Sequence, residues 1–106
     1  MDILMKSSRL NKDIIEQVRK HIAPFASFKH VFLFGSILEL NTINNDIDIL
    51  IIYTEYSNGF GNDLILFSNK LERESGMLVD ITSLSVEEEK ETRFLDKIKP
   101  RCLKLK

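Results

Sequence analysis

Apolar positions recur along the chain with helical spacing in some stretches and strand spacing in others. Residues 11–23 place Ile14, Ile15, Val18 and Ile22 on one helical face, with Asn11 as the cap and Pro24 beyond the end. Residues 30–34 (HVFLF) form a short apolar run that stops at Gly35, which predicts a buried strand followed by a turn into a short helix. The chain therefore opens with a helix and a strand.

The middle of the chain predicts a second strand and a second helix. A polar, turn-forming stretch at residues 41–45 leads into DIDILIIY, which alternates and then becomes continuously apolar, as in a strand with one solvated end. Residues 57–61 break the pattern, and residues 62–75 predict a helix with Leu64, Phe67 and Leu71 on one face and Gly76 at its C-terminal end.

The last third predicts one more strand and one more helix. Residues 77–84 (MLVDITSL) read as a strand with Asp80 in its middle, and Ser85 with Glu88 forms a capping-box pattern for a helix through about Ile98. The basic stretch KIKPRCLKLK is predicted to be a solvated helix face and a frayed tail, with docking to a partner as the alternative. The order predicts one small α/β domain, residues 1–106, with a mixed sheet flanked by helices.

Composition and charge narrow the class of protein. The 106 residues are 43% hydrophobic and 29% charged, which is the balance of a folded globular domain. The net charge of -1 gives no basic field for long nucleic acids, and the lone Cys102 offers neither an internal disulfide nor part of a zinc site. The N-terminus is too short and polar for a signal sequence and no apolar run could span a bilayer, so a cytoplasmic location is expected.

The chemically informative segment is FGSILELNTINNDIDILII. Strand alternation puts Asp46 and Asp48 on one face with their Cα atoms about 6.7 Å apart. Two carboxylates about 5 Å apart repel by roughly 3 kcal/mol at an effective dielectric near 20, so a cation is expected between them. Hard oxygen ligands favour Mg²⁺, with Mn²⁺ as the alternative, and the remaining Mg²⁺ positions usually go to water and substrate phosphates.

Two further elements complete the pattern. Asp80 interrupts an apolar strand, where an unpaired buried charge would cost several kcal/mol, and it can join the pair if its strand lies beside the second one. Gly35 allows close approach of a ligand to the backbone, and Ser36 offers a hydroxyl for phosphate oxygens at the start of a helix. Each of these features alone is common in structural turns and solvated strand ends, and together they favour a metal-phosphate site.

These residues resemble the DNA polymerase beta-like nucleotidyltransferase superfamily, and most closely its minimal (MNT) branch. Gly35 and Ser36, nine intervening residues, Asp46 and Asp48, and a later strand aspartate at Asp80 match the family pattern. The chain departs from it at Glu39 and Leu40, where the family usually has Arg-Gly, and at Asn45, where Ser is common before the first aspartate.

The resemblance implies a reaction and a site. A nucleoside monophosphate, AMP from ATP, would pass to a hydroxyl while pyrophosphate leaves. Asp46, Asp48 and Asp80 would bind Mg²⁺, Gly35 and Ser36 would bind the nucleotide phosphates, and Asp80 would help to activate the acceptor. Glu39 places an anion near a triphosphate, which weakens the expectation of a high catalytic rate.

The resemblance also implies a partner. Minimal members often accompany a HEPN-domain toxin and, as antitoxins of such toxin-antitoxin pairs, adenylylate a tyrosine on it. Two alternatives stay open: a catalytically weak module that neutralises a partner by docking, and transfer to a small molecule such as an aminoglycoside, which usually needs an additional domain.

Overall fold

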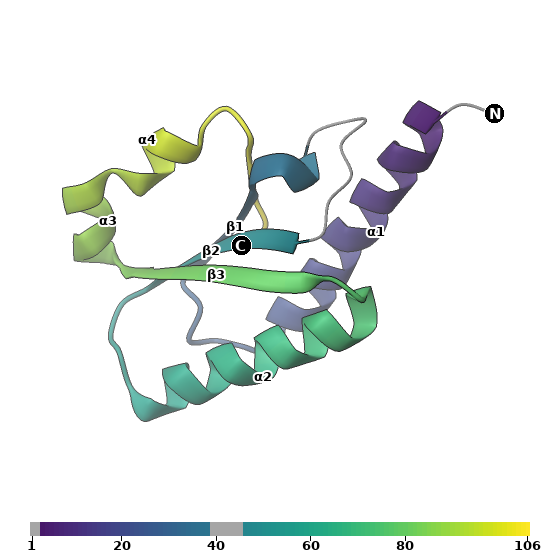
Figure 1. Cartoon of the computed structure of the whole chain (residues 1–106). Helices are drawn as coiled ribbons and strands as arrows, with labels where there is room; N and C mark the ends of the chain where they lie inside the picture. Colours follow the sequence, from purple (N-terminus) through teal and green to yellow (C-terminus); the bar gives the residue numbers. More distant parts are fainter. Residues whose placement is uncertain (1–2, 39–45) are drawn as a thin grey trace.

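Four strands form one mixed sheet in the order β3-β2-β1-β4 (Figure 1). In this computed structural model, which describes residues 3–38 and 46–106, the strands are β1 (His30–Phe34), β2 (Asp46–Tyr53), β3 (Leu78–Ser85) and β4 (Cys102–Lys104). β1 is antiparallel to β2 and to β4, whereas β2 is parallel to β3. The predicted α/β class with a mixed sheet is confirmed, and the first two strands have the predicted bounds.

The helices lie on both sides of this sheet. They are α1 (Ile3–Ile22), α2 (Asn58–Ser75), α3 (Val86–Thr92) and α4 (Phe94–Ile98), with a short 3₁₀ helix, η1 (Gly35–Leu38), directly after β1. Figure 1 shows α2 below the sheet, and α4 and the blue η1 segment above it. No helix within the described residues is long and apolar enough to cross a membrane.

One face of the sheet carries the main hydrophobic core. Strand alternation sends the odd-numbered residues of β1, β2 and β3 toward α1 and α2. The fully buried members include Val31, Leu33, Ile47, Ile49 and Ile51 from the strands, and Val18, Phe60, Phe67 and Leu71 from the helices. This cluster holds the parallel pair of β2 and β3 against two helices, so it fixes where the other face lies.

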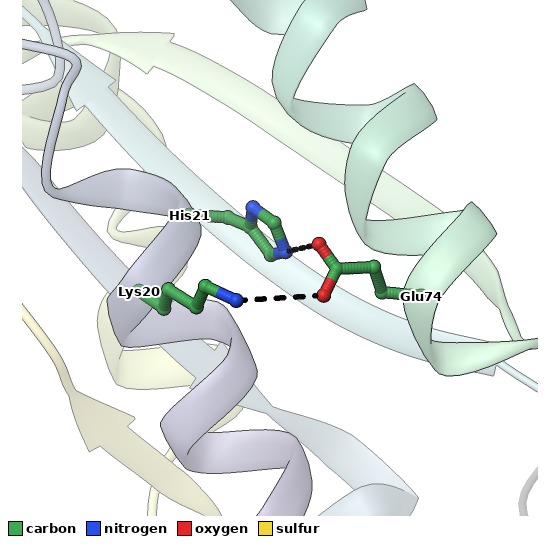
Figure 2. A network of polar contacts seen from close by, with 3 residues as sticks. All are labelled: Lys20, His21 and Glu74. Carbon is green, nitrogen blue, oxygen red and sulfur yellow. Dashed lines mark ion pairs between the residues drawn. The ribbon is translucent and has the colours of Figure 1, made fainter.

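A polar contact joins the two helices of this layer (Figure 2). Glu74 of α2 lies 2.7 Å from Nε2 of the buried His21 and 3.6 Å from Nζ of Lys20, both on α1. The contact lies beside the core, where it places a carboxylate next to a buried imidazole. Within this layer His21 therefore has a structural role.

Two helix starts differ from the prediction. α1 begins at Ile3, so Asn11 is an interior residue and the predicted cap is wrong; Asn costs at most about 0.7 kcal/mol inside a helix, and the preceding residues include the helix formers Leu, Met, Lys and Arg. α2 begins at Asn58 rather than Asn62, because the Ser57 hydroxyl accepts the Phe60 N–H at 3.1 Å and burial of the Phe60 ring outweighs two nearby glycines.

The helix ends of α2 and α3 follow the predicted capping chemistry. Gly76 adopts φ 71° and donates its N–H to the Glu72 carbonyl, closing α2. The Ser85 and Glu88 capping box is confirmed by two bonds: the Glu88 N–H donates to Ser85 Oγ at 3.0 Å, and the Ser85 N–H donates to Glu88 Oε1 at 2.9 Å. The strand before it runs from Leu78 to Ser85, one residue later than predicted.

The C-terminal region is more ordered than predicted. A single final helix is wrong, because Arg93 adopts φ 52° and separates α3 from α4. A frayed tail is also wrong, since Cys102–Lys104 pairs with β1 and the Lys106 ammonium donates to the Phe25 carbonyl at 2.9 Å. The reason is that leucines and lysines alternate in this segment. Leu105 packs against the core, and the segment forms an edge strand.

Candidate active site

Three chain segments meet at one end of the sheet. β1 ends with Phe34 paired to Asp48 of β2, and Asp48 is in turn the register partner of Asp80 on β3. Register partners lie on the same face of a sheet, and Asp46 shares that face because it is two residues before Asp48. The structure therefore brings together all three aspartates that the sequence singled out, on the face opposite α1 and α2.

Gly35 lies directly against this carboxylate group. It adopts φ 83°, a conformation that side chains rarely tolerate, and a Cβ built on it would stand 2.7 Å from Oδ2 of Asp48. Only glycine lets β1 turn here while its backbone stays next to Asp48. The close approach expected from the sequence is present, and in this structure it is an approach to Asp48.

Ser36 follows as the second residue of η1 and is half-buried. Because η1 has only four residues, it has no extended helix dipole to attract phosphate. Any phosphate contact here would depend on the hydroxyl and on individual N–H groups. The segment that follows, including the departures at Glu39, Leu40 and Asn45 and the predicted turn at 41–45, lies outside the described residues.

The charges at this end of the sheet oppose ionisation of Asp48. Partial burial raises the pKa of the Asp48 carboxyl above its ordinary value, and the neighbouring Asp46 and Asp80 raise it further. A divalent cation would relieve this repulsion. The side chain best placed to need a cation is therefore the central aspartate of the three.

Asp80 avoids the cost of an unpaired buried charge by lying at the edge of the sheet. β3 is an edge strand of the sheet, and Asp80 is exposed to solvent. The desolvation cost that made a ligand necessary does not arise there. What supports Asp80 as a site residue is its register position beside Asp48 and its effect on the Asp48 pKa.

The donor set fits a cation that arrives with its substrate. Within residues 3–38 and 46–106, no three His, Cys, Asp or Glu side chains form a ready-made metal cage. Mg²⁺ does not require such a cage, because it commonly uses one or two carboxylates and completes its shell with water and phosphate oxygens. Asp48 with Asp46 or Asp80 supplies that smaller set.

An aromatic contact covers the neighbouring part of this face. Phe94 of α4 packs edge-on against Phe34, with the ring centroids 5.7 Å apart. From the apolar run at residues 30–34, Phe34 was predicted to be buried in a strand, and no role was predicted for Phe94. The sequence signal for this contact is the large apolar side chain of Phe94 in an otherwise polar stretch, directly after Arg93.

Comparison with known proteins agrees with this geometry. The profile of the nucleotidyltransferase domain family matches residues 11–105. The chain belongs to the nucleotidyltransferase domain family. No curated protein matches the chain with significance.

Solved structures share the fold of this nucleotidyltransferase domain. A Sulfolobus solfataricus protein, provisionally described as a nucleotidyltransferase, is 23% identical with a TM-score of 0.57, and the match covers 98% of this chain and 86% of that one. A complex of a tri-AMPylated Shewanella oneidensis HEPN toxin with an MNT antitoxin gives 16% identity, a TM-score of 0.51, and coverage of 94% and 71%. The MntA-HepT toxin-antitoxin complex gives 18% identity and a TM-score of 0.53, and the match covers 93% of this chain and 71% of that one.

These matches confirm the resemblance seen in the sequence. The family follows from the profile, which covers most of the chain, and the fold follows from the structures. At identities below 25% the structures carry the fold alone.

Proposed function

We propose that the chain, as one domain over residues 1–106, is an Mg²⁺-dependent nucleotidyltransferase that moves AMP from ATP to a hydroxyl on a partner protein. Asp46, Asp48 and Asp80 bind the metal, and Gly35 and Ser36 bind the nucleotide. The activity belongs in the cytoplasm, where ATP and Mg²⁺ are abundant.

The supporting observation is the position of Asp48. It is held between Asp80, its register partner, and the backbone of Gly35, and its pKa is raised first by partial burial and then by both neighbouring aspartates. A structural role alone gives no reason to keep three carboxylates together on two neighbouring strands at one end of the sheet. A substrate whose phosphates come with a divalent cation supplies the missing positive charge.

The reaction needs little covalent chemistry from the protein. The acceptor oxygen forms a bond to the α-phosphorus, the bond from that phosphorus to the α,β-bridging oxygen breaks, and pyrophosphate leaves with the bonding electrons. Bound Mg²⁺ supplies charge neutralisation for the phosphates. Asp80, which is exposed beside Asp48, is accessible to an incoming hydroxyl and accepts its proton. Gly35 has no side chain, so the phosphates can approach its backbone closely.

A HEPN-type toxin is the proposed acceptor. Two of the structures that share this fold are toxin-antitoxin complexes, and the HEPN toxin in the Shewanella complex carries AMP groups. The match to the Shewanella complex spans 94% of the present chain. A protein acceptor would bring its own hydroxyl to the open face of the sheet.

The second candidate function is a docking module that silences its partner without chemistry. The observations that favour it are the replacement of the family's Arg-Gly by Glu39 and Leu40, and the lack of a ready-made metal cage in the described part of the chain. Under this hypothesis the aspartates are dispensable for silencing the partner.

A labelling experiment separates the two. The protein is incubated with Mg²⁺, a HEPN-domain protein from the same genome, and ATP labelled at either the α- or the γ-phosphate. Nucleotidyl transfer labels the partner from α-labelled ATP only, and the Asp46→Asn/Asp48→Asn variant is expected to give no label.

Three results count against the proposal. Label from γ-ATP would indicate phosphoryl transfer, and labelling that survives in the double variant would disprove the assigned site. A wild type that binds and silences the HEPN protein without labelling it, with a double variant that does the same, would establish the docking module instead.

A further inference from the structure

A basic pocket lies immediately beside Gly35, on the side where the chain returns from α4 to β4. It has a volume of about 290 Å³. Its lining consists of Phe34 and Gly35 from the end of β1, and of Lys97, Ile98, Lys99, Pro100 and Arg101 from the C-terminal segment. Three of the seven lining residues are cationic and none is acidic, so the pocket is suited to an anion.

The pocket is lined in part by a residue of the sheet face that carries the carboxylates. Phe34 lines it, and Phe34 is the register partner of Asp48, so both residues are on that face. Gly35 belongs to both places: it lines the pocket, and its backbone lies against Oδ2 of Asp48. Gly35 thus lies between the Asp48 carboxylate and the pocket.

The basic segment is anchored by its backbone. The Gly35 N–H donates to the Arg101 carbonyl at 3.1 Å, and the adjoining Cys102 pairs with Phe34. The Lys99 side chain is only weakly held, since its ammonium contacts Asp96 at 3.9 Å with both side chains about two-thirds exposed. An exposed pair of this length contributes little, so redirecting Lys99 toward a ligand costs little.

We propose that this pocket binds the β- and γ-phosphates of the nucleoside triphosphate, with Lys97, Lys99 and Arg101 supplying the charge. The inference rests on the proposed function, because it assigns the part of the substrate that leaves as pyrophosphate. The carboxylates with their cation hold the α-phosphate end, and the C-terminal segment holds the other end. In a polyphosphate that passes over Gly35, the α-phosphate lies beside the cation and the β- and γ-phosphates lie beside the basic side chains.

An acidic side chain of a partner protein would suit the same positive charges. The two ligands are distinguished by comparing nucleotides that have and lack the β- and γ-phosphates. The two probes are a nonhydrolysable ATP analogue and AMP, each titrated calorimetrically with Mg²⁺. The test variant is Lys97→Gln/Lys99→Gln, which leaves the backbone anchor at Arg101 in place. The matched control is Lys12→Gln/Lys70→Gln, which removes the same charge from exposed positions on α1 and α2, behind the other face.

The test variant is expected to bind the ATP analogue about tenfold more weakly than the wild type, with AMP affinity unchanged and the loss shrinking as salt is raised. The control variant is expected to bind both probes within about twofold of the wild type, since its charges are exposed on the helices that cover the other face of the sheet. Lys97→Arg/Lys99→Arg preserves the charge and is expected to retain tight binding, which guards against a folding defect.

The inference and the proposed function fail in different ways. Unchanged ATP-analogue affinity in Lys97→Gln/Lys99→Gln, or an equal loss for AMP, overturns the phosphate pocket. In that case the proposed function survives if Asp46→Asn/Asp48→Asn still abolishes binding. A wild type that binds no ATP analogue with Mg²⁺ overturns both.

Discussion

The two faces of the sheet are built for different purposes, although the same strands supply both. The face toward α1 and α2 holds the fully buried residues Ile47, Ile49 and Ile51 of β2. The face toward α4 changes along β2, from buried Leu50 to the half-buried Asp48 near the strand's start. Neighbouring residues of β2 thus lie on opposite faces of the sheet, one in the hydrophobic core and the next among the carboxylates.

The comparison explains how the fold tolerates a repulsive site. Repulsion between clustered carboxylates lowers the stability of the folded protein, and a separate, well-packed core offsets this loss. The helix-covered face supplies most of the buried apolar area and therefore the stability. Substitutions on the two faces should consequently separate stability from ligand binding.

The largest expected effect on stability comes from the covered face. Phe28 is fully buried and its ring contacts those of Phe25, Phe60 and Phe67. Phe28→Ala is expected to lower the free energy of unfolding by about 3–5 kcal/mol in urea denaturation, through lost burial and the cavity left behind. If that variant does not fold, Phe28→Leu is expected to show a smaller loss.

Phe32 provides the control for this prediction. It is only half-buried and points to the other face, so Phe32→Ala is expected to cost less than half as much. Equal losses from the two alanine variants would contradict the assignment of the core to the α1 and α2 side.

A pair of glycines tests the other face. Gly35 and Gly76 both adopt positive φ angles, 83° and 71°, but only at Gly35 does an added Cβ meet a neighbour, the Asp48 carboxylate. Both Gly→Ala variants are expected to lose about 1–2 kcal/mol of stability from backbone strain. Binding of a nonhydrolysable ATP analogue with Mg²⁺ should fall at least tenfold in Gly35→Ala and stay unchanged in Gly76→Ala. Equal binding by the two variants would remove Gly35 from the site.

The smallest effect is a pH dependence of stability without metal. Because the pKa of Asp48 is raised in the folded protein above its ordinary value of 3.8, the group's contribution is fully present below that value and is lost as pH rises through the higher folded pKa. Asp48→Asn should therefore match the wild type at acidic pH and melt a few degrees higher at neutral pH. Adding Mg²⁺ with the ATP analogue should reverse the difference by stabilising the wild type alone. A variant that melts lower at neutral pH without ligand would contradict the repulsion.

The sequence predicted the parts of the fold that depend on local patterns. The apolar runs of β1 and β2, the capping box at Ser85 and the closing glycine at Gly76 each carry a short-range signal, and each was found in place. The adjacency of β2 and β3 depends on long-range packing, and from the sequence it was only the condition under which Asp80 could join the other two aspartates.

The errors lie where tertiary contacts outweigh local signals. Arg93 breaks the last helix although its sequence context favours continuation, and Phe94 then packs on Phe34. The basic tail became β4 because Leu103 pairs with Leu33 across the strands, a contact that a count of lysines conceals. The same error hid the pocket beside Gly35, whose cationic lining is distant in sequence from the carboxylates.

The most direct test of the account is a calorimetric titration of a nonhydrolysable ATP analogue with Mg²⁺ into the wild type, Asp46→Asn/Asp48→Asn, and the charge-matched control Asp13→Asn/Glu55→Gln, which changes exposed acids away from the site. The account predicts Mg²⁺-dependent binding by the wild type and the control, and none by the site variant. Absence of binding by the wild type, or retained binding by the site variant, would contradict it.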